Sequence, residues 1–303
     1  MKRVLVTGAS GFIGRHVLAP LVERGYDVHG TRSTAGVPAE APAGVTWHTA
    51  DLLDRSAATD LVARVRPTDL LHLAWYAVPG LFWTADVNAD WVRATSALAD
   101  AVIANGGERI VGAGTCAEYD WSSGTCDELS TPLQPRTRYG AAKVAACRYL
   151  LDRNSRLTRG SAWGRVFFMY GPDEHPARLV SSIIRLVLAG EPAPCTEGSQ
   201  RRDFLDVRDV AAGFVQLLDS SVTGAVNISA GVAIAVGELA ERAAAAAGRP
   251  ELLRRGALPS RADEPHLIVG VPGRLTREAA WSPRIDLDRG LADAVRSWRE
   301  RMG

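Results

Sequence analysis

The sequence has few cysteines and shows no cysteine or histidine pattern of a metal site. Its 303 residues include four cysteines, Cys116, Cys126, Cys147 and Cys195, and their spacing contains no C-x-x-C pair. Neither a zinc site nor a disulfide framework is therefore indicated, and we expect no bound metal.

An excess of charge of one sign is also missing. The 35 Lys and Arg residues and 34 Asp and Glu residues leave a formal net charge of +1, with no long basic block. Proteins that bind nucleic acid or an anionic membrane surface usually carry a basic patch. Neither partner is therefore expected.

Long hydrophobic runs are absent as well. The longest apolar stretch, LLHLAWYAVPGLFW, is interrupted by His72, Pro79 and Gly80 and is too short to span a bilayer. The first residues, MKRVLVTGAS, lead directly into an expected strand and glycine turn, without the apolar region of a secretory signal. With 47% apolar and 23% charged residues, the composition is that of a globular protein, and we expect a cytoplasmic location.

What the sequence does contain is an alternation of strands and helices. RVLVTG is a continuous apolar run of the buried parallel type, and GRHVLAPLVERG follows with apolar residues on one helical face. Pro20 inside this helix should kink it, at a cost of about 3 kcal/mol if nothing compensates. Further strands are expected at 26–32, 45–52, 69–75, 109–115 and 164–172, and further helices at 61–67, 88–106 and 136–153. This order predicts an α/β fold with a Rossmann-type, doubly wound parallel sheet.

The last third of the chain is less regular. Apolar residues recur at helical spacing in 179–190 and 286–302, and an alanine-rich helix is expected at 237–248. We expect two lobes. Residues 1–171 would bind the cofactor and also receive part of 203–230, and residues 172–303 would form a smaller α/β lobe for the substrate.

A glycine-rich turn follows the first expected strand. Gly8, Gly11 and Gly14 have the spacing G-x-x-G-x-x-G, which departs from G-x-G-x-x-G. The physical role is the same, because glycines allow a tight turn close to a pyrophosphate, and the helix N-terminus favours an anion. A dinucleotide site is predicted, with a purely structural turn as the alternative.

The end of the second strand bears on which dinucleotide is bound. A carboxylate there favours NAD, whereas an arginine suits the 2′-phosphate of NADP. The position is occupied by Arg32, followed by Ser33, and no carboxylate occurs before Glu40. A guanidinium can form paired hydrogen bonds with a phosphate. We therefore expect NADPH rather than NAD, with a solvated surface arginine as the alternative.

A tyrosine and a lysine lie one turn apart in RTRYGAAKVAACRYLLDR. Tyr139 and Lys143 are spaced i and i+4, which brings their side chains together on one helix face. A phenol has a pKa near 10, and a neighbouring ammonium lowers it toward the range useful for a general acid. The pair is interpreted as a proton-transfer unit, with a plain surface contact as the alternative.

These features in combination resemble the extended short-chain dehydrogenase/reductase family. The glycine turn is followed by GAGTCAEY at a strand end and by YGAAK at a helix start. The resemblance covers nearly the whole chain. It includes Asp51-Leu52, HLAW at 72–75, YGP at 170–172, RRDFLDVRDVA at 201–211 and WSPRIDLDRGL at 281–291.

The resemblance implies roles for individual residues. Tyr139 would be the catalytic acid/base, and Lys143 would lower its pKa and bind the nicotinamide ribose. Thr115, four residues before Tyr119, would bind the substrate oxygen. The implied cofactor-binding residues are Gly8, Ser10, Gly11, Phe12, Ile13, Gly14, Arg32, Ser33, Asp51, Leu52, Leu73, Ala74, Trp75, Tyr139 and Lys143.

The resemblance also narrows the reaction. Sugar-nucleotide dehydratases of this family usually carry Asp-Glu after the Ser/Thr, where this chain has Cys116 and Ala117, so a dehydratase is not expected. Arg32 favours exchangeable NADPH and net reduction. We expect reduction of the C4 ketone of a nucleotide-activated 4-keto-6-deoxysugar. An epimerase with tightly bound NAD(P), a ketoreductase for a non-sugar substrate and a redox-sensing binding protein are the alternatives.

Substrate contacts are expected from several segments. Arg202, with further charge from Arg178 and Arg261, is expected to bind the substrate diphosphate, although each could be a surface arginine. Phe168 replaces an asparagine usual in the family, which makes an apolar group such as a C6 methyl plausible. Thr115 and Cys116 complete the expected set, and the rings that could line a sugar pocket or simply pack are Trp75, Trp83 and Trp121.

A homodimer is also expected. The helices containing NADWVRATSALADAV and YGAAKVAACRYL resemble the pair that forms a four-helix dimer interface in the family. Packing of both helices against the protein's own sheet would produce a similar pattern.

Overall fold

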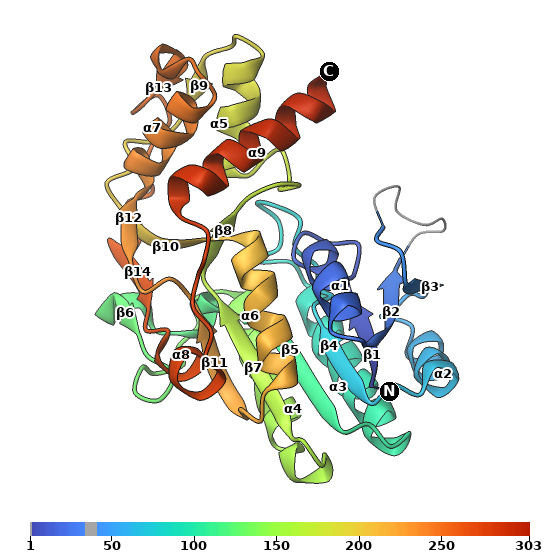
Figure 1. Ribbon diagram of the computed structural model, residues 1–303. Helices are drawn as coiled ribbons and strands as arrows, with labels where there is room; N and C mark the ends of the chain where they lie inside the picture. Colours follow the sequence, from blue (N-terminus) through green and yellow to red (C-terminus); the bar gives the residue numbers. More distant parts are fainter. Residues whose placement is uncertain (1, 34–40) are drawn as a thin grey trace.

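The computed structural model describes residues 2–33 and 41–303. Its centre is a seven-stranded parallel sheet with the order β11-β7-β5-β4-β1-β2-β3 (Figure 1). The chain first builds the sheet outward from β1 to β3 and then returns to add β4, β5, β7 and β11 on the other side. The strands are β1 (Arg3–Thr7), β2 (Asp27–Arg32), β3 (Val45–Thr49), β4 (Asp69–His72), β5 (Arg109–Thr115), β7 (Ser161–Val166) and β11 (Gly224–Ile228).

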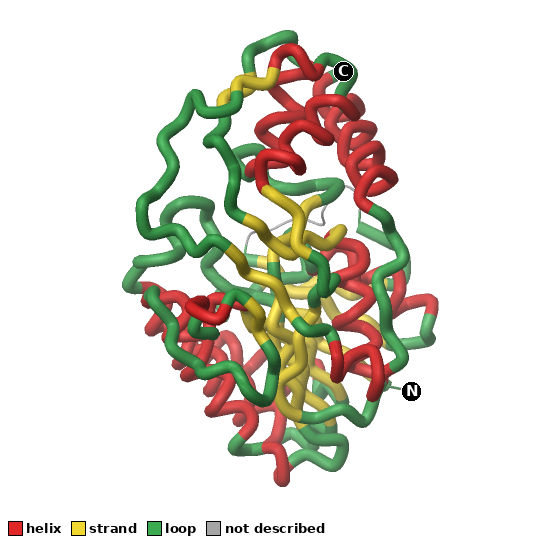
Figure 2. Tube along the Cα trace, turned by 90° about the vertical axis from the view of Figure 1, so that its left-hand side faces the viewer, coloured by secondary structure: helices red, strands yellow, loops and turns green. Residues whose placement is uncertain are grey.

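Helices cover both faces of this sheet, as the edge-on view in Figure 2 shows. On one face lie α1 (Gly14–Glu23), which runs through Pro20, and α6 (Val207–Asp219). On the other face lie α2 (Arg55–Val65), α3 (Val87–Ala104) and α4 (Arg138–Leu151). A separate buried apolar cluster fills each interface, so both faces exclude water. The predicted doubly wound α/β fold is confirmed.

A second, smaller lobe stands at the carboxyl ends of the large sheet's strands (Figure 1). Its sheet has the order β12-β10-β14-β6, with β8 also pairing with β10. The strands are β6 (Thr125–Cys126), β8 (Phe168–Tyr170), β10 (Arg201–Asp206), β12 (Ala233–Ala235) and β14 (Leu267–Gly270). A third apolar cluster lies among α5 (Leu179–Leu188), α7 (Val236–Ala246) and α9 (Leu287–Met302). The short elements are β9 (Ala193–Pro194), β13 (Leu253–Arg254) and α8 (Gly273–Ala279).

The expected strand at 164–172 is in fact two strands, and the single-strand prediction is wrong. β7 ends at Val166 between β5 and β11, whereas β8 begins at Phe168 and pairs with β10 in the second sheet. Phe167 turns the chain between the two sheets, and its ring is buried with Tyr119 and Cys126.

Two segments therefore cross between the sheets. β11, from the second half of the chain, is the edge strand of the large sheet, and β6, from the first half, belongs to the small one. The division of the chain at residue 171 stays a prediction. In the described ranges, 2–33 and 41–303, no helix is both long and apolar enough to cross a membrane.

Candidate active site

The glycine turn between β1 and α1 is built for close backbone approach. Gly8 has φ +68°, and a Cβ there would lie 2.8 Å from the backbone N of Ala74. A Cβ on Gly14 would overlap the Gly8 carbonyl oxygen, and Gly11 N donates to that same oxygen at 2.9 Å. Only glycine satisfies this geometry at Gly8 and Gly14.

The first turn of α1 has free polar groups. Its N-cap is Ile13, so no side chain caps the helix, and the first turn holds no acidic residue. Ser10 and Gly11 are exposed and Phe12 is half-buried. Uncapped N–H groups at a helix N-terminus attract a phosphate. The turn therefore fits the pyrophosphate of a dinucleotide.

The segment after β4 lies beside this turn. Leu73 N and Ala74 N donate to Thr7 O and Oγ1 at 3.2 and 3.3 Å, and Ala74 lies against Gly8. β4 ends at His72, earlier than expected. Asp51 is exposed and accepts from Leu53 N at 2.9 Å, while Leu52 is buried. The crevice between β1 and β4 is the topological switch point of the sheet, the usual ligand position in this architecture.

Arg32 lies at the end of β2, as expected. Its guanidinium carbon is 5.8 Å from the centre of the Trp47 ring. Its Nε is buried and has no hydrogen-bond partner within residues 2–33 and 41–303. Ser33 is exposed beside it. Glu40, the next carboxylate in the sequence, lies outside the described residues.

Tyr139 lies in the first turn of α4, which Thr137 caps by accepting from Gly140 N at 3.0 Å. Its hydroxyl lies close enough to the side chain of Thr115, the last residue of β5, for that side chain to lower the pKa of the phenol. Three aromatic rings meet the phenol ring edge to face: Phe82 at 4.9 Å, Trp83 at 5.8 Å and Trp75 at 6.4 Å between centroids. The structure thus brings Thr115 and Tyr139 together, with Trp75 and Trp83 around them.

The electrostatics of Tyr139 differ from the expectation. Burial raises the pKa of the phenol and the charge of Glu118 raises it further, while the nearby Thr115 side chain and the charge of Arg178 lower it. Lys143 is not among the main causes of this shift, and its lowering of the Tyr139 pKa stays a prediction. A phenol with a raised pKa is protonated at neutral pH, which is the state of a proton donor.

The position of Lys143 explains this difference. Its Nζ donates to Ala113 O at 2.7 Å and lies 3.7 Å from the centre of the Trp75 ring, facing the backbone of β5 and an indole. The Tyr139 ring is 5.8 Å away. Burial lowers the pKa of Lys143 to about 7, and the charge of Glu118 opposes that shift.

Glu118 is the site residue that the sequence reasoning missed. It is fully buried, and its side chain accepts a hydrogen bond from Thr115 N at 2.9 Å. Thr115 in turn accepts from Ala117 N at 3.2 Å, which completes a capping box. Thr-x-x-Glu is the sequence signature of that box, so the spacing of Thr115 and Glu118 could have revealed it.

The expected substrate residues are only partly brought together. Arg202 is 3% exposed, its Nη2 donates to Glu264 Oε1 at 2.9 Å, and its guanidinium lies 5.5 Å from the centre of the half-buried Phe168 ring. Its charge also lowers the pKa of the buried Cys116 thiol, although burial raises that pKa far more. Arg202, Phe168 and Cys116 therefore lie close together.

The other two arginines lie apart from that group. Arg178 precedes α5 with its guanidinium 5.6 Å from the centre of the Phe82 ring, so it faces the Tyr139 side of the site. Arg261 lies exposed in the loop that carries Glu264. Trp121 donates from Nε1 to Cys116 O at 2.7 Å.

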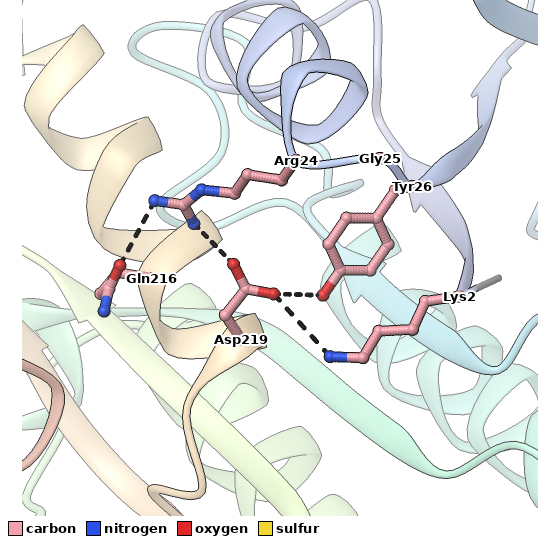
Figure 3. A pocket seen from close by; sticks show the side chains of 6 residues that line it. All are labelled: Lys2, Arg24, Gly25, Tyr26, Gln216 and Asp219. Atoms are coloured by element: carbon pink, nitrogen blue, oxygen red, sulfur yellow. Dashed lines mark hydrogen bonds and ion pairs between the residues drawn. The ribbon is translucent and has the colours of Figure 1, made fainter.

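A separate cavity of about 520 Å³ lies at the opposite end of the sheet. Figure 3 shows Tyr26, Arg24 and Lys2 converging on Asp219, with the Tyr26 hydroxyl donating at 2.5 Å. Lys2 and Tyr26 precede β1 and β2, so this cavity is at the amino ends of the strands. Ligands of doubly wound parallel sheets bind at the carboxyl ends of the strands, so this cavity is not expected to be the ligand site. The charged side chains that line it connect α6 to the amino ends of β1 and β2.

Comparison with known proteins agrees with this arrangement. The model of the NAD dependent epimerase/dehydratase family matches residues 4–229. The chain belongs to this family. The resemblance to extended short-chain dehydrogenases/reductases is confirmed, and the chain is an enzyme of the epimerase/dehydratase type.

Two relatives and one solved structure are similar to this chain over most of its length. The chain is 27% identical to dTDP-6-deoxy-L-talose 4-dehydrogenase (NAD(+)) of Aggregatibacter actinomycetemcomitans, over 75% of this chain and 84% of that protein. It is 28% identical to UDP-glucose 4-epimerase of Mycolicibacterium smegmatis, over 99% of each. UDP-glucose 4-epimerase of Thermus thermophilus in complex with NAD superimposes with a TM-score of 0.85 at 26% identity, over 98% of this chain and 99% of that one.

Proposed function

We propose that this epimerase/dehydratase family member reduces the C4 ketone of a nucleotide-activated 4-keto-6-deoxysugar with NADPH. The observation that carries the proposal is the proximity of the Thr115 and Tyr139 side chains at the carboxyl end of the sheet. Two hydroxyl groups that converge there can hold one carbonyl oxygen between them.

The residues proposed to hold the cofactor are the glycine turn, Arg32 and the segment after β4. A bound reduced nicotinamide would supply the hydride for the ketone carbon. Tyr139, kept protonated by burial, donates its proton to the oxygen that becomes the alcohol, and Thr115 donates a hydrogen bond to the same oxygen. Solvent then returns a proton to Tyr139. Lys143 is proposed to bind the nicotinamide ribose.

The preference for NADPH rests on Arg32. Its buried Nε lacks a partner in the described part of the chain, which leaves the guanidinium available to a 2′-phosphate. The solved relative from Thermus thermophilus holds NAD, so the cofactor is the part of the proposal that needs the most direct test.

Net reduction is favoured over dehydration by the residues after Thr115. Cys116 and Ala117 are both buried, and burial keeps the Cys116 thiol neutral by raising its pKa. Neither side chain can act as an acid/base pair for elimination of water. The Aggregatibacter relative is named for dehydrogenation at position 4 of a nucleotide-activated 6-deoxysugar, and reduction of a C4 ketone is the reverse of such a step.

The substrate would lie between the two lobes. Arg202 and Arg178 are proposed to bind the diphosphate, and Phe168 to contact an apolar C6 methyl group. Arg261, exposed in its loop, would have to move toward Arg202 to contribute.

The proposal is tested by incubating the purified protein with NADPH or NADH and a panel of nucleotide 4-keto-6-deoxysugars. We expect stoichiometric loss of absorbance at the nicotinamide wavelength with NADPH, and a C4 alcohol by NMR. Denatured protein is then expected to release no nucleotide cofactor. Release of NAD(H), together with interconversion of sugars without consumption of NADPH, would instead support an epimerase, the second candidate that the names of the Mycolicibacterium and Thermus relatives favour.

We also propose a homodimer formed through α3 and α4. These helices pack side by side, and Tyr149 of α4 donates to Asp100 of α3 at 2.6 Å, so the pair presents one continuous outer surface. Sedimentation equilibrium should give twice the chain mass of 32.4 kDa. A monomer at micromolar concentration would contradict this proposal.

A further inference from the structure

Glu118 is a fully buried acid beside the reacting pair that the mechanism above does not use. Its Oε1 accepts from Thr115 N at 2.9 Å and from Trp163 Nε1 at 2.8 Å. The first of these bonds fixes the turn that follows β5. Because Thr115 begins that turn, the position of its hydroxyl depends on Glu118.

The second oxygen of Glu118 anchors the carboxylate to the sheet. Oε2 accepts from Arg165 Nε at 2.7 Å, and Arg165 Nη1 donates to the Tyr119 hydroxyl at 3.0 Å. The Tyr119 hydroxyl donates to Asn227 Oδ1 at 2.7 Å. Glu118, Arg165, Tyr119 and Asn227 are each at most 2% exposed, so these side chains are shielded from solvent. These three donors, Thr115 N, Trp163 Nε1 and Arg165 Nε, hold the carboxylate in place.

The Glu118 carboxylate affects Lys143, whose immediate surroundings in the described part of the chain contain no anion. Nζ faces Ala113 O on β5 and the rings of Trp75 and Trp163, the latter at 5.6 Å. None of these carries a full charge. A buried ammonium without an anion nearby loses its proton readily.

The titratable groups packed around Lys143 are neutral. On α4, burial raises the pKa of Tyr139 and of Cys147. At the end of β4, burial lowers the pKa of His72 to about 3. Trp163 contacts both groups, because its Nε1 donates to Glu118 Oε1 at 2.8 Å and its ring centre lies 5.6 Å from Lys143 Nζ. Among the charged side chains of residues 2–33 and 41–303, Glu118 is the one whose charge favours the ammonium form of Lys143.

We propose that Glu118 is a positioning residue that holds Thr115 in place and keeps Lys143 charged in its buried position. This inference rests on the proposed function, because it assigns Glu118 a task in the same site. The ion pair with Arg165 holds the Glu118 carboxylate in place. The carboxylate in turn positions the Thr115 hydroxyl and stabilises the charge of Lys143. No other acid of the described chain bonds to the turn after β5 in this way.

The charge of Lys143 can be read without substrate or cofactor. Its Nζ lies 3.7 Å from the centre of the Trp75 ring, so loss of the ammonium charge should change the indole fluorescence. A pH titration of the protein alone should show a transition that is absent in Lys143→Met. In Glu118→Gln this transition is expected about one pH unit lower, the small end of the effect of a nearby opposite charge.

Two further variants separate charge from structure. Glu118→Gln leaves Arg165 buried without its ionic partner, so Glu118→Gln/Arg165→Met removes both charges and protects the test against failure to fold. Tyr119→Phe is the matched control, since it removes a hydrogen bond of the same buried network, the one that Arg165 Nη1 donates, but keeps the charge of Glu118 and the rings around Lys143. Its Lys143 transition should stay within about 0.3 pH unit of the wild-type value, well inside the shift expected from a charge.

Activity supplies the second readout. With the charge removed, the fall of kcat/KM at high pH should move to lower pH by the same amount as the fluorescence transition. Unchanged transitions in both Glu118 variants would overturn the inference, and so would an equal shift in Tyr119→Phe. Full turnover by Tyr139→Phe would instead refute the proposed function and leave the fluorescence result standing.

Discussion

Removing Arg32 should change the choice of cofactor without weakening the fold. The guanidinium has a buried Nε without a partner in the described chain and one ring contact, at 5.8 Å from the Trp47 centroid. Arg32→Ala therefore breaks no ion pair that the structure describes. The lost cation–π contact accounts for at most about 1 kcal/mol at such a site.

The effect on NADPH should be larger. A hydrogen bond to a charged group contributes about 1.5–3 kcal/mol, and a guanidinium can form two with a phosphate. Loss of about 2–4 kcal/mol corresponds to a decrease of about 30- to 1,000-fold in kcat/KM for NADPH, at 1.4 kcal/mol for each factor of ten. For NADH, which has no 2′-phosphate, kcat/KM should change less than about threefold.

Initial rates with both cofactors at fixed substrate measure this difference. Arg64→Ala is the control, because Arg64 is an exposed arginine in the last turn of α2 and tests the general loss of positive charge. Urea denaturation should show similar stability for both variants. Equal losses with NADPH and NADH in Arg32→Ala would refute the role of Arg32 as a phosphate ligand.

Three more outcomes are expected. Gly14→Ala should destabilise the protein by about 1–3 kcal/mol in urea denaturation and weaken cofactor binding, because its Cβ would overlap a backbone oxygen of the turn; unchanged stability would contradict this. Burial raises the pKa of Glu174 from 4.5 to about 7, so the folded state binds the proton of this carboxyl more tightly than the unfolded state does. As the pH rises from 4.5 to 7, the free energy of unfolding should therefore fall by up to about 3 kcal/mol relative to that of Glu174→Gln. Parallel curves of unfolding free energy against pH for the two proteins would contradict this. Glu264 competes with a bound diphosphate for Arg202, and a hydrogen bond from Arg202 to a charged partner is stronger by about 1 kcal/mol than one to a neutral partner. Glu264→Gln should therefore tighten binding of a nucleoside diphosphate about fivefold, as measured by calorimetry. Weaker binding would show that Glu264 orients Arg202 for the ligand.

Much of the large sheet was predictable from the sequence. Buried parallel strands read as continuous apolar runs, and Gly8 and Gly25 end the first strand and the first helix. The crossing at Phe167 was not predictable, because apolar residues continue through 166–170 while the hydrogen-bond partners change from β5 and β11 to β10. Pairing partners are a property of tertiary structure, and a hydrophobic pattern does not contain them.

In the site, too, local spacing was predictable from the sequence and tertiary contacts were not. Spacing on a helix predicted that Tyr139 and Lys143 share a face, and they do lie one turn apart on α4. Spacing gave no information about where the ammonium points, because Ala113 O belongs to β5 and the Trp75 ring to the segment after β4. The Glu118–Arg165 pair links positions 47 residues apart, which no local pattern reveals.

The proton donor is best tested by Tyr139→Phe with NADPH and a nucleotide 4-keto-6-deoxysugar. The substitution removes one hydroxyl and leaves the contacts of the ring with Phe82, Trp83 and Trp75. We expect kcat to fall about 100- to 10,000-fold, the usual contribution of a positioned acid, while the Kd for NADPH changes less than about threefold. Turnover close to that of the wild-type protein would show that the phenol of Tyr139 does not donate the proton.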